Sequence, residues 1–95
     1  MAFYAYILLC ADGSFYTGHT EHLENRIADH QYGRFGGYTA RRRPVRLMWS
    51  ETFPTRYEAL TVERQIKGWS RAKKQALIDG NWARVSKLAR NRQNR

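Results

Sequence analysis

Five polar side chains in this sequence are of types that can act together on a phosphate group: Tyr6, Tyr16, Arg26, His30 and Glu63. The guanidinium of an arginine is always charged, and its forked donors suit a phosphate or a developing phosphorane. A histidine can titrate near neutrality and move a proton. Tyrosine has an ordinary pKa of about 10 and becomes a useful base only where neighbouring cations, such as Arg26 and His30, favour its phenolate. Collected in one cleft, the set indicates chemistry on a phosphate backbone.

Glu63 is the sharpest anomaly, because it falls within the apolar arc of an expected helix, beside Ala59 and Ile66. A carboxylate there is costly unless it is paired, protonated or bound to a metal ion. Lys67 follows four residues later and could simply pair with it. The other interpretation is a magnesium site, since Mg²⁺ typically needs only one or two carboxylates when phosphate and water complete its coordination.

Arg26 and His30 are four residues apart, so on a helix they project from one face. Leu23 and Ile27 mark the buried stripe of that helix. At about 100° per residue, His30 falls inside the stripe and Arg26 on its edge. Two interpretations stay open: a surface arginine beside a hydrogen-bonded core histidine, or a catalytic pair.

The two tyrosines lie on two short strands joined by an Asp-Gly turn, which is a strong hairpin signal. A two-residue loop would turn Tyr16 to the face opposite Tyr6. A three-residue loop over residues 11–13 instead pairs Tyr6 with Gly18 and Tyr16 with Leu8. Both tyrosines then share one face, because side chains alternate with period two. We predict the three-residue loop, on the hypothesis that the tyrosines belong to one site.

The remaining pattern predicts an α+β fold, a three-stranded antiparallel sheet flanked by helices in the order ββαβααα. Helices are expected from Glu21 to Tyr32, with Thr20 as N-cap and Gly33 as stop, and from a capping box at Thr55. The glycine-rich, charged residues 33–44 are expected to lack regular structure, with a third strand at 45–52. Ser70 and Asn81 should cap two further helices. We expect one domain over residues 1–80 and a basic helix or tail over residues 81–95.

The formal net charge of +9 on 95 residues is large. Such positive density attracts polyanions by counterion release, so nucleic acid is the leading partner. Part of the charge lies in the expected loop and part in the tail, where Arg90, Arg92 and Arg95 have no acidic neighbour. The residues expected to contact a nucleic-acid backbone are Tyr38, Arg41, Arg42, Arg43, Lys67, Arg71, Lys73 and Lys74.

Several other classes of protein are excluded or disfavoured. The single cysteine, Cys10, cannot form an internal disulfide, which suits a reducing compartment and a cytoplasmic protein. The apolar stretch at residues 5–11 is far short of the roughly 20 residues of a membrane span. The sequence has no zinc-ligand spacing, phosphate-cradling loop, dinucleotide fingerprint or nucleophile elbow.

Over residues 3–79 the chain closely resembles the GIY-YIG nuclease domain, and in particular its small stand-alone bacterial members of the UPF0213 kind, which are related to Slx-type structure-specific endonuclease subunits. Tyr4-Ala5-Tyr6 corresponds to the first motif and Tyr16-Thr17-Gly18 to the second, while Arg26, His30 and Glu63 match the helix motif and the metal-binding glutamate. Tyr4 and Ala5 replace the glycine and aliphatic residue of the first motif, and Thr17 replaces the isoleucine of the second.

The resemblance implies metal-dependent cleavage of phosphodiester bonds in DNA, with RNA also open. It gives Tyr6 the role of general base toward water, with His30 assisting. Arg26 would stabilise charge on the pentacoordinate phosphorus, and Glu63 would hold one Mg²⁺ or Mn²⁺ near the leaving oxygen. Tyr16 would orient the water or metal beside the scissile phosphate.

Two alternatives to an endonuclease remain. One is a nucleic-acid-binding module of the same fold that cleaves weakly or needs a partner chain. The other is an accessory protein that binds structured RNA or the ribosome. The charge fits all three functions equally, whereas the presence of all five candidate catalytic residues favours the enzyme.

Overall fold

The computed structural model describes residues 2–34 and 36–93, and it confirms the α+β class and the three-stranded antiparallel sheet. The strands are β1 (Phe3–Leu9), β2 (Phe15–Thr20) and β3 (Arg46–Phe53), in the spatial order β2-β1-β3. The helices are α1 (Leu23–Tyr32), α2 (Gly37–Ala40), α3 (Arg56–Lys67), α4 (Arg71–Ile78) and α5 (Trp82–Gln93).

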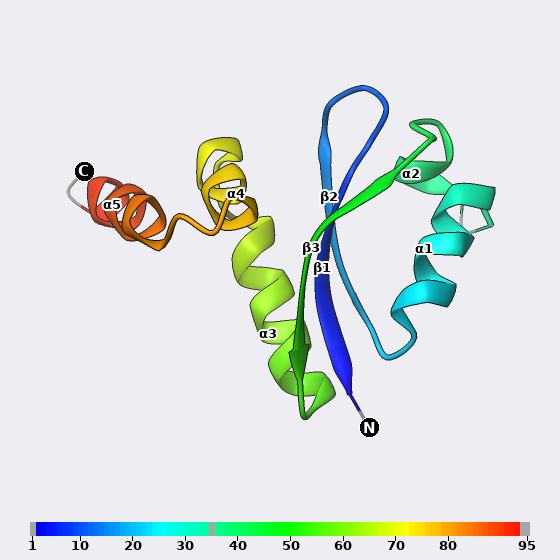
Figure 1. Cartoon of the computed structure of the whole chain (residues 1–95), viewed down its shortest axis with the longest axis horizontal. Helices are drawn as coiled ribbons and strands as arrows, with labels where there is room; N and C mark the ends of the chain where they lie inside the picture. Colours follow the sequence, from blue (N-terminus) through cyan, green and yellow to red (C-terminus); the bar gives the residue numbers. More distant parts are fainter. Residues whose placement is uncertain (1, 35, 94–95) are drawn as a thin grey trace.

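Helices cover both faces of the sheet (Figure 1). Helices α1 and α2 lie on one side, and α3 and α4 on the other. Because side chains alternate along β1, its neighbours Tyr6 and Ile7 enter different cores. Ile7 packs with Ile66 and Leu77 of α3 and α4, while Tyr6 packs with Leu8 and, from α1, Leu23 and Ile27.

The hairpin has the predicted three-residue loop. Tyr6 pairs with Gly18, and Leu8 with Tyr16. The Cys10 N–H donates to the Ser14 carbonyl at 2.8 Å, and Gly13 has φ +85°, a left-handed conformation that a glycine adopts without strain. Tyr6 and Tyr16 therefore lie on the same face of the sheet.

The first helix begins at Leu23, so its expected start at Glu21, with Thr20 as N-cap, is wrong. Thr20 Oγ1 accepts a hydrogen bond from the His22 N–H at 3.1 Å, which closes a turn before the helix. Gly33 ends the helix as predicted, in the left-handed conformation with φ 69°.

The order ββαβααα omitted one element, because residues 33–44 contain the single-turn helix α2. This turn is held by contacts from outside the segment. The Thr39 hydroxyl lies 2.8 Å from Nδ1 of His30, and the Ala11 N–H donates to the Arg42 carbonyl at 2.8 Å. Local sequence pattern carries no information on such contacts, so the expectation of an irregular loop was wrong at α2.

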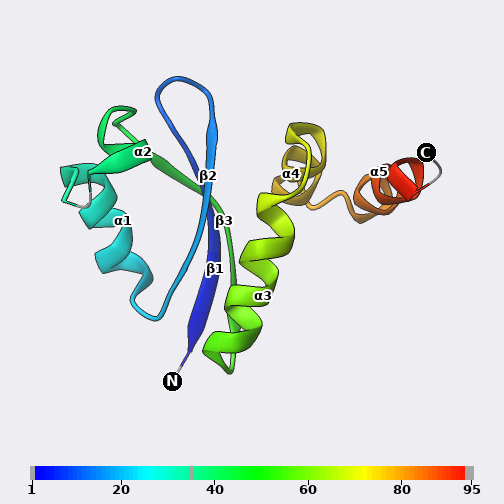
Figure 2. The ribbon, with the colours of Figure 1, turned by 180° about the vertical axis from the view of Figure 1, so that it is seen from behind.

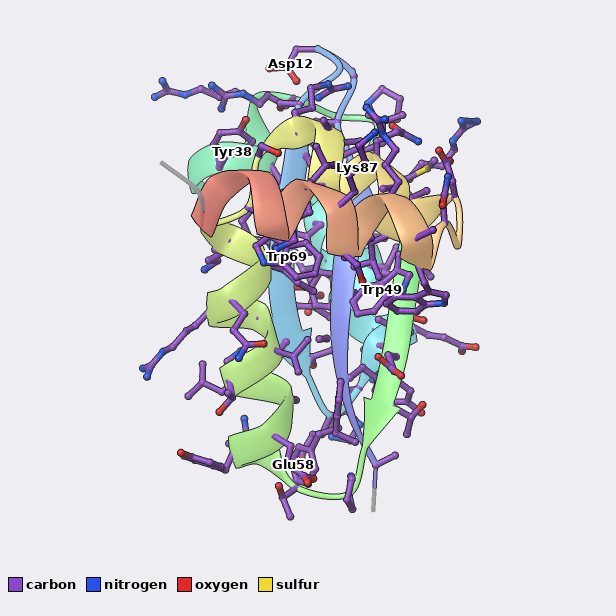
Figure 3. All side chains as sticks on the ribbon, turned by 90° about the vertical axis from the view of Figure 1, so that its left-hand side faces the viewer. Asp12, Tyr38, Trp49, Glu58, Trp69 and Lys87 are labelled. Carbon is purple, nitrogen blue, oxygen red and sulfur yellow. The ribbon has the colours of Figure 1, made fainter. Side chains whose placement is uncertain are left out.

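The helices after β3 have the predicted side-chain caps: Thr55 accepts from the Glu58 N–H, Ser70 from the Lys73 N–H and Asn81 from the Arg84 N–H. Helix α5 packs on α4 and adds Val85 to the core that contains Ile7. Figure 3 shows α5 crossing this side of the molecule, with Trp49 and Trp69 close by. Arg95 and the side chains of residues 89–93 lie outside the described part of the structure. Among the described helices, none has the length and apolarity to cross a membrane.

Candidate active site

A chain of three buried polar side chains lies between the sheet and α1. The Tyr6 hydroxyl lies 3.0 Å from Nε2 of His30, and Nδ1 of His30 lies 2.8 Å from the Thr39 hydroxyl. Tyr6 is 1% exposed, His30 4% and Thr39 3%. In the tautomer with its proton on Nδ1, His30 donates to Thr39 and accepts from Tyr6. These hydrogen bonds therefore join β1, α1 and α2, and no sequence pattern indicated Thr39 as the third member.

The pKa values of this pair favour neutral forms of both groups. Burial raises the pKa of Tyr6 well above its ordinary value of 10.0, and the nearby Tyr16 and Glu63 raise it further, while Arg26 lowers it. Burial also lowers the pKa of His30 from 6.5, with Arg26 acting in the same direction. Arg26 thus favours the Tyr6 phenolate as expected, but desolvation outweighs it. Tyr6 is a protonated phenol beside a neutral imidazole.

Protein stability should depend on the ionisation of His30. Because its pKa is lowered in the folded state, the unfolded chain binds more protons between that pKa and 6.5. The free energy of unfolding should therefore fall as the pH falls below 6.5, as urea denaturation at a series of pH values would measure. A His30→Gln variant should lose this part of the pH dependence, and a His22→Gln variant, altered at an exposed histidine, should keep it. An unchanged slope in His30→Gln would contradict the assignment.

Gly18 makes room for the Tyr6 ring. A Cβ atom at position 18 would lie 2.5 Å from the Tyr6 hydroxyl oxygen and 2.6 Å from the ring carbon that carries it. The ring of Tyr6 thus lies across its pairing partner on β2, and this position brings its hydroxyl to His30.

A Gly18→Ala variant should therefore displace Tyr6 from His30 and destabilise the fold by about 1–3 kcal/mol through overpacking. Thermal or urea unfolding measures the loss. Gly68→Ala is the matched control, because a Cβ there meets its nearest atom at an ordinary 3.5 Å. Equal stability of the Gly18→Ala variant and the wild-type protein would show that the ring is not held in this position.

A cavity of about 350 Å³ opens beside the hydrogen-bonded side chains of Tyr6, His30 and Thr39. Its walls include Tyr16, Arg26, His30 and Tyr38, together with the α2 turn. The Tyr16 and His30 rings meet edge to face with their centroids 5.0 Å apart, and the Tyr16 and Tyr38 centroids are 6.1 Å apart. Tyr6 is not among the residues that line this cavity, and it is joined to them by its hydrogen bond to His30. The structure thus brings four of the five candidate residues together on the α1 face of the sheet.

Glu63 belongs to the opposite face, where α3 packs on the sheet. It is 7% exposed, and its Oε1 atom lies 3.0 Å from Nδ1 of His19 on β2. Its Oε2 atom lies 3.6 Å from the Lys67 ammonium, so the predicted pairing of Glu63 with Lys67 is present. Sequence reasoning missed His19. Strand alternation predicts that His19 faces away from Tyr16, but only the packing of α3 on the sheet shows that His19 contacts Glu63.

The two groups of residues meet at strand β2, which is an edge of the sheet (Figure 2). A second cavity, of about 210 Å³, crosses this edge. Tyr16 and Tyr38 line it from the α1 side, and Phe15, Thr17, Lys67 and Lys74 line it from the α3 side. The five candidate residues thus occupy two faces joined by an edge, not a single cleft on one face.

The basic residues singled out in the sequence have different surroundings. Arg42 donates from Nε to Asp12 at 2.9 Å and from Nη1 to the Tyr38 carbonyl at 2.8 Å, with its guanidinium 3.8 Å from the centre of the Tyr38 ring. Asp12 and Tyr38 accordingly lie at the same end of the molecule (Figure 3). Arg43 and Arg41 are both exposed, and Arg43 donates to the main-chain carbonyls of Ala40 and Gln31. Arg42 therefore anchors the segment that carries Tyr38.

On α4, Arg71 lies over the Phe15 ring and Lys73 over the Trp69 ring. Lys74 and Lys67 line the second cavity. Of the residues predicted to contact a nucleic-acid backbone, Tyr38, Lys67 and Lys74 therefore lie at the edge of β2, beside the candidate catalytic residues.

At this site one carboxylate, that of Glu63, is available to bind a divalent metal ion. Within residues 2–34 and 36–93, no group of three or more His, Cys, Asp or Glu side chains could hold a metal ion. Glu63 supplies oxygen, the donor that Mg²⁺ and Mn²⁺ prefer, and His19 can fix its orientation. The Oε2 atom already faces a cation, the Lys67 ammonium. This donor set fits a metal ion whose other ligands are water and substrate phosphate.

The fold is that of a GIY-YIG domain. The sequence pattern of the GIY-YIG catalytic domain matches residues 2–76, and the chain belongs to this family. Among its relatives are small UPF0213 proteins. That of Staphylococcus saprophyticus is 49% identical over 75 residues, which are 79% of this chain and 92% of the relative.

Two solved structures share the fold. The solution structure of the UPF0213 protein from Bacillus halodurans has a TM-score of 0.55 and 43% sequence identity, covering 83% of this chain and 84% of that one. The solution structure of a protein from E. faecalis has a TM-score of 0.59 and 40% identity, covering 84% of this chain and 85% of that one.

Proposed function

We propose that this chain is an endonuclease that hydrolyses phosphodiester bonds in DNA by attack of water, with one divalent metal ion. The observation that carries the proposal is the cavity that Arg26, Tyr16 and His30 line together, with His30 hydrogen-bonded to Tyr6. A fixed positive charge and a proton-accepting pair beside one cavity are what hydrolysis of a phosphodiester requires. Membership of the GIY-YIG family supports the same reaction class.

The Tyr6–His30 pair takes the proton of the attacking water. Because the pKa of Tyr6 is raised and His30 is neutral, a free phenolate is not the base. Tyr6 does not line the cavity, so the water must first reach its hydroxyl from the side of Tyr16 and Arg26, both of which influence the pKa of Tyr6. The Tyr6 oxygen then accepts the water proton as its own proton moves to Nε2 of His30, across the existing hydrogen bond. The water oxygen then bonds to phosphorus, the phosphorus–oxygen ester bond breaks, and the leaving oxygen takes a proton from solvent.

Arg26 acts on the phosphate and Tyr16 on the attacking water. Both line the cavity, and the guanidinium of Arg26 offers forked donors to the oxygens of the phosphorane. Tyr16 orients the water with its hydroxyl, next to the His30 ring. Thr39 holds the His30 ring in position through Nδ1.

Glu63 would hold the Mg²⁺ or Mn²⁺ ion, with Lys67 moving away from Oε2 as the ion binds. The ion, when bound, neutralises charge that develops on the leaving oxygen. His19 keeps the Glu63 carboxylate oriented toward the β2 edge through its bond to Oε1.

A cleavage assay tests the proposal. The purified chain is incubated with linear, forked and nicked DNA and with structured RNA, in Mg²⁺, in Mn²⁺ or in EDTA. We expect cleavage of at least one DNA that requires the metal and is lost in an Arg26→Ala variant. A Lys87→Ala variant, altered at an exposed cation on α5, should keep it.

Binding without cleavage under every condition would overturn the proposal and favour a nucleic-acid-binding module, alone or with a partner chain. Cleavage or binding confined to RNA would instead favour the RNA- or ribosome-associated function. Cleavage that persists in EDTA would exclude the metal-dependent reaction.

A further inference from the structure

The second cavity continues the first along the edge of the sheet. It shares Tyr16 and Tyr38 with the cavity that contains Arg26 and His30, and it extends past β2 toward α3 and α4. A ligand in the first cavity that continues across the β2 edge would therefore enter the second.

The far wall of this cavity carries positive charge. Lys67 and Lys74 line it, and Arg71 precedes Lys74 by three residues on α4, on the same face of the helix. Among the side chains that the structure describes, no ion pair joins Lys74 or Arg71 to a carboxylate, and Glu63 is the one carboxylate paired with Lys67. Burial lowers the pKa of Lys74, and Arg71 and Lys67 lower it further. The folded chain thus holds Lys74 beside two other cations, which costs stability and attracts an anion.

Thr17 is a second, independent sign of a ligand. It lines the cavity and is 3% exposed, and its hydroxyl is the one buried side-chain oxygen or nitrogen in the described structure that has no hydrogen-bond partner. Leaving a buried hydroxyl unpaired is unfavourable. Valine, which has the same shape and no polar atom, would fit β2 without this cost, whereas rotation of the Thr17 side chain about χ1 would bring the hydroxyl to an acceptor in the cavity.

We propose that this cavity is a subsite for the phosphate that neighbours the scissile phosphate on the same strand, held by Lys74 and Lys67 with the Thr17 hydroxyl as a further donor. The Phe15 ring lies on the same side of the cavity, and Tyr16 and Tyr38 separate the two phosphates and contact the sugar between them. The inference rests on the proposed function and gives the path of the strand: from the α1 face, across the edge of β2, to α4.

Thymidine 3′,5′-bisphosphate is the smallest probe of this inference, because it carries two phosphates separated by one nucleoside. Its binding is followed by NMR titration without metal, beside thymidine 3′-monophosphate and 5′-monophosphate. With both subsites present, the bisphosphate should bind about tenfold more tightly than either monophosphate, because its second phosphate binds intramolecularly. Shifts should appear near His30 and near Lys74 together.

Four variants separate the subsites. Lys74→Met and Thr17→Val should each weaken the binding of the bisphosphate relative to the monophosphates. In Lys74→Met the bisphosphate should bind no more tightly than a monophosphate does. Arg26→Met should remove the shifts near His30 and keep those near Lys74. Lys87→Met, which removes one exposed charge from α5, should leave the tighter binding of the bisphosphate intact. Lys74→Met and Thr17→Val should also raise the melting temperature, because they remove a repulsion and an unpaired hydroxyl, whereas residues with a structural role alone would lower it.

Equal binding of bisphosphate and monophosphates by the wild-type chain would overturn the inference. The inference would also be overturned if Lys87→Met weakened the preference for the bisphosphate as much as Lys74→Met does, because the effect would then come from overall charge. The titration needs no cleavage. A chain that fails to cut DNA but binds the bisphosphate in this way would contradict the nuclease reaction and support the subsite.

Discussion

Replacing Glu63 by glutamine is expected to reduce Mg²⁺-dependent cleavage of DNA by about a thousandfold, because a metal ion contributes several kcal/mol to stabilising transition-state charge. Glutamine keeps the shape of the side chain but lacks the negative charge that attracts the cation. Cleavage rates at saturating DNA, measured over a range of Mg²⁺ concentrations, test this expectation. Glu51→Gln, altered at an exposed carboxylate on β3, is the control and should behave as the wild-type chain does.

The same variant separates two roles of Glu63. If the carboxylate only pairs with His19 and Lys67 for stability, Glu63→Gln should lower the melting temperature and leave the cleavage rate of the folded fraction unchanged. That result would exclude Glu63 as the metal ligand. A folded variant that cuts slowly at every Mg²⁺ concentration supports the assignment.

Tyr6→Phe is expected to reduce the cleavage rate by about a hundredfold to ten-thousandfold, the range that general acid–base catalysis contributes. Phenylalanine retains the ring packed over Gly18 and removes only the hydroxyl bonded to His30. Because a nitrogen of His30 then loses a partner, stability should fall by about 1–3 kcal/mol, so rates are compared well below the melting temperature. The loss should appear in kcat and not in KM, since Tyr6 lies outside the cavity walls.

Tyr4→Phe is the matched control for this prediction. Tyr4 lies two residues earlier on β1 and faces the same side of the sheet, so its variant also removes one phenol from that face. It should cleave at the wild-type rate. A Tyr6→Phe variant that did the same would show that the Tyr6–His30 pair takes no part in proton transfer.

Much of this arrangement could be predicted from local sequence. The Asp-Gly turn predicted the hairpin, and the hypothesis that both tyrosines belong to one site selected the three-residue loop, whose register places Tyr6 opposite Gly18. Helical spacing indicated the burial of His30 and the pairing of Glu63 with Lys67, and the apolar neighbours of Glu63 indicated its burial. Each of these features depends on residues within a few positions of one another.

What could not be predicted depends on packing between distant segments. His19 and Glu63 are 44 residues apart, and only the placement of α3 on the far face brings them together. The same placement separates Glu63 from Tyr16 and makes the β2 edge the meeting point of the two groups. The raised pKa of Tyr6 likewise follows from its burial beneath α1, which local spacing does not give.

The central claim is that side chains on two faces of the sheet act as one catalytic site across the edge of β2. Its most direct test is a single assay of Mg²⁺-dependent DNA cleavage, comparing the wild-type chain with Tyr6→Phe and Arg26→Met from one face and Glu63→Gln from the other. All three variants should remain folded by NMR and lose at least about a hundredfold in rate. If the variants on one face lose activity while the variants on the other face cleave DNA at the wild-type rate, the two faces do not form one catalytic site.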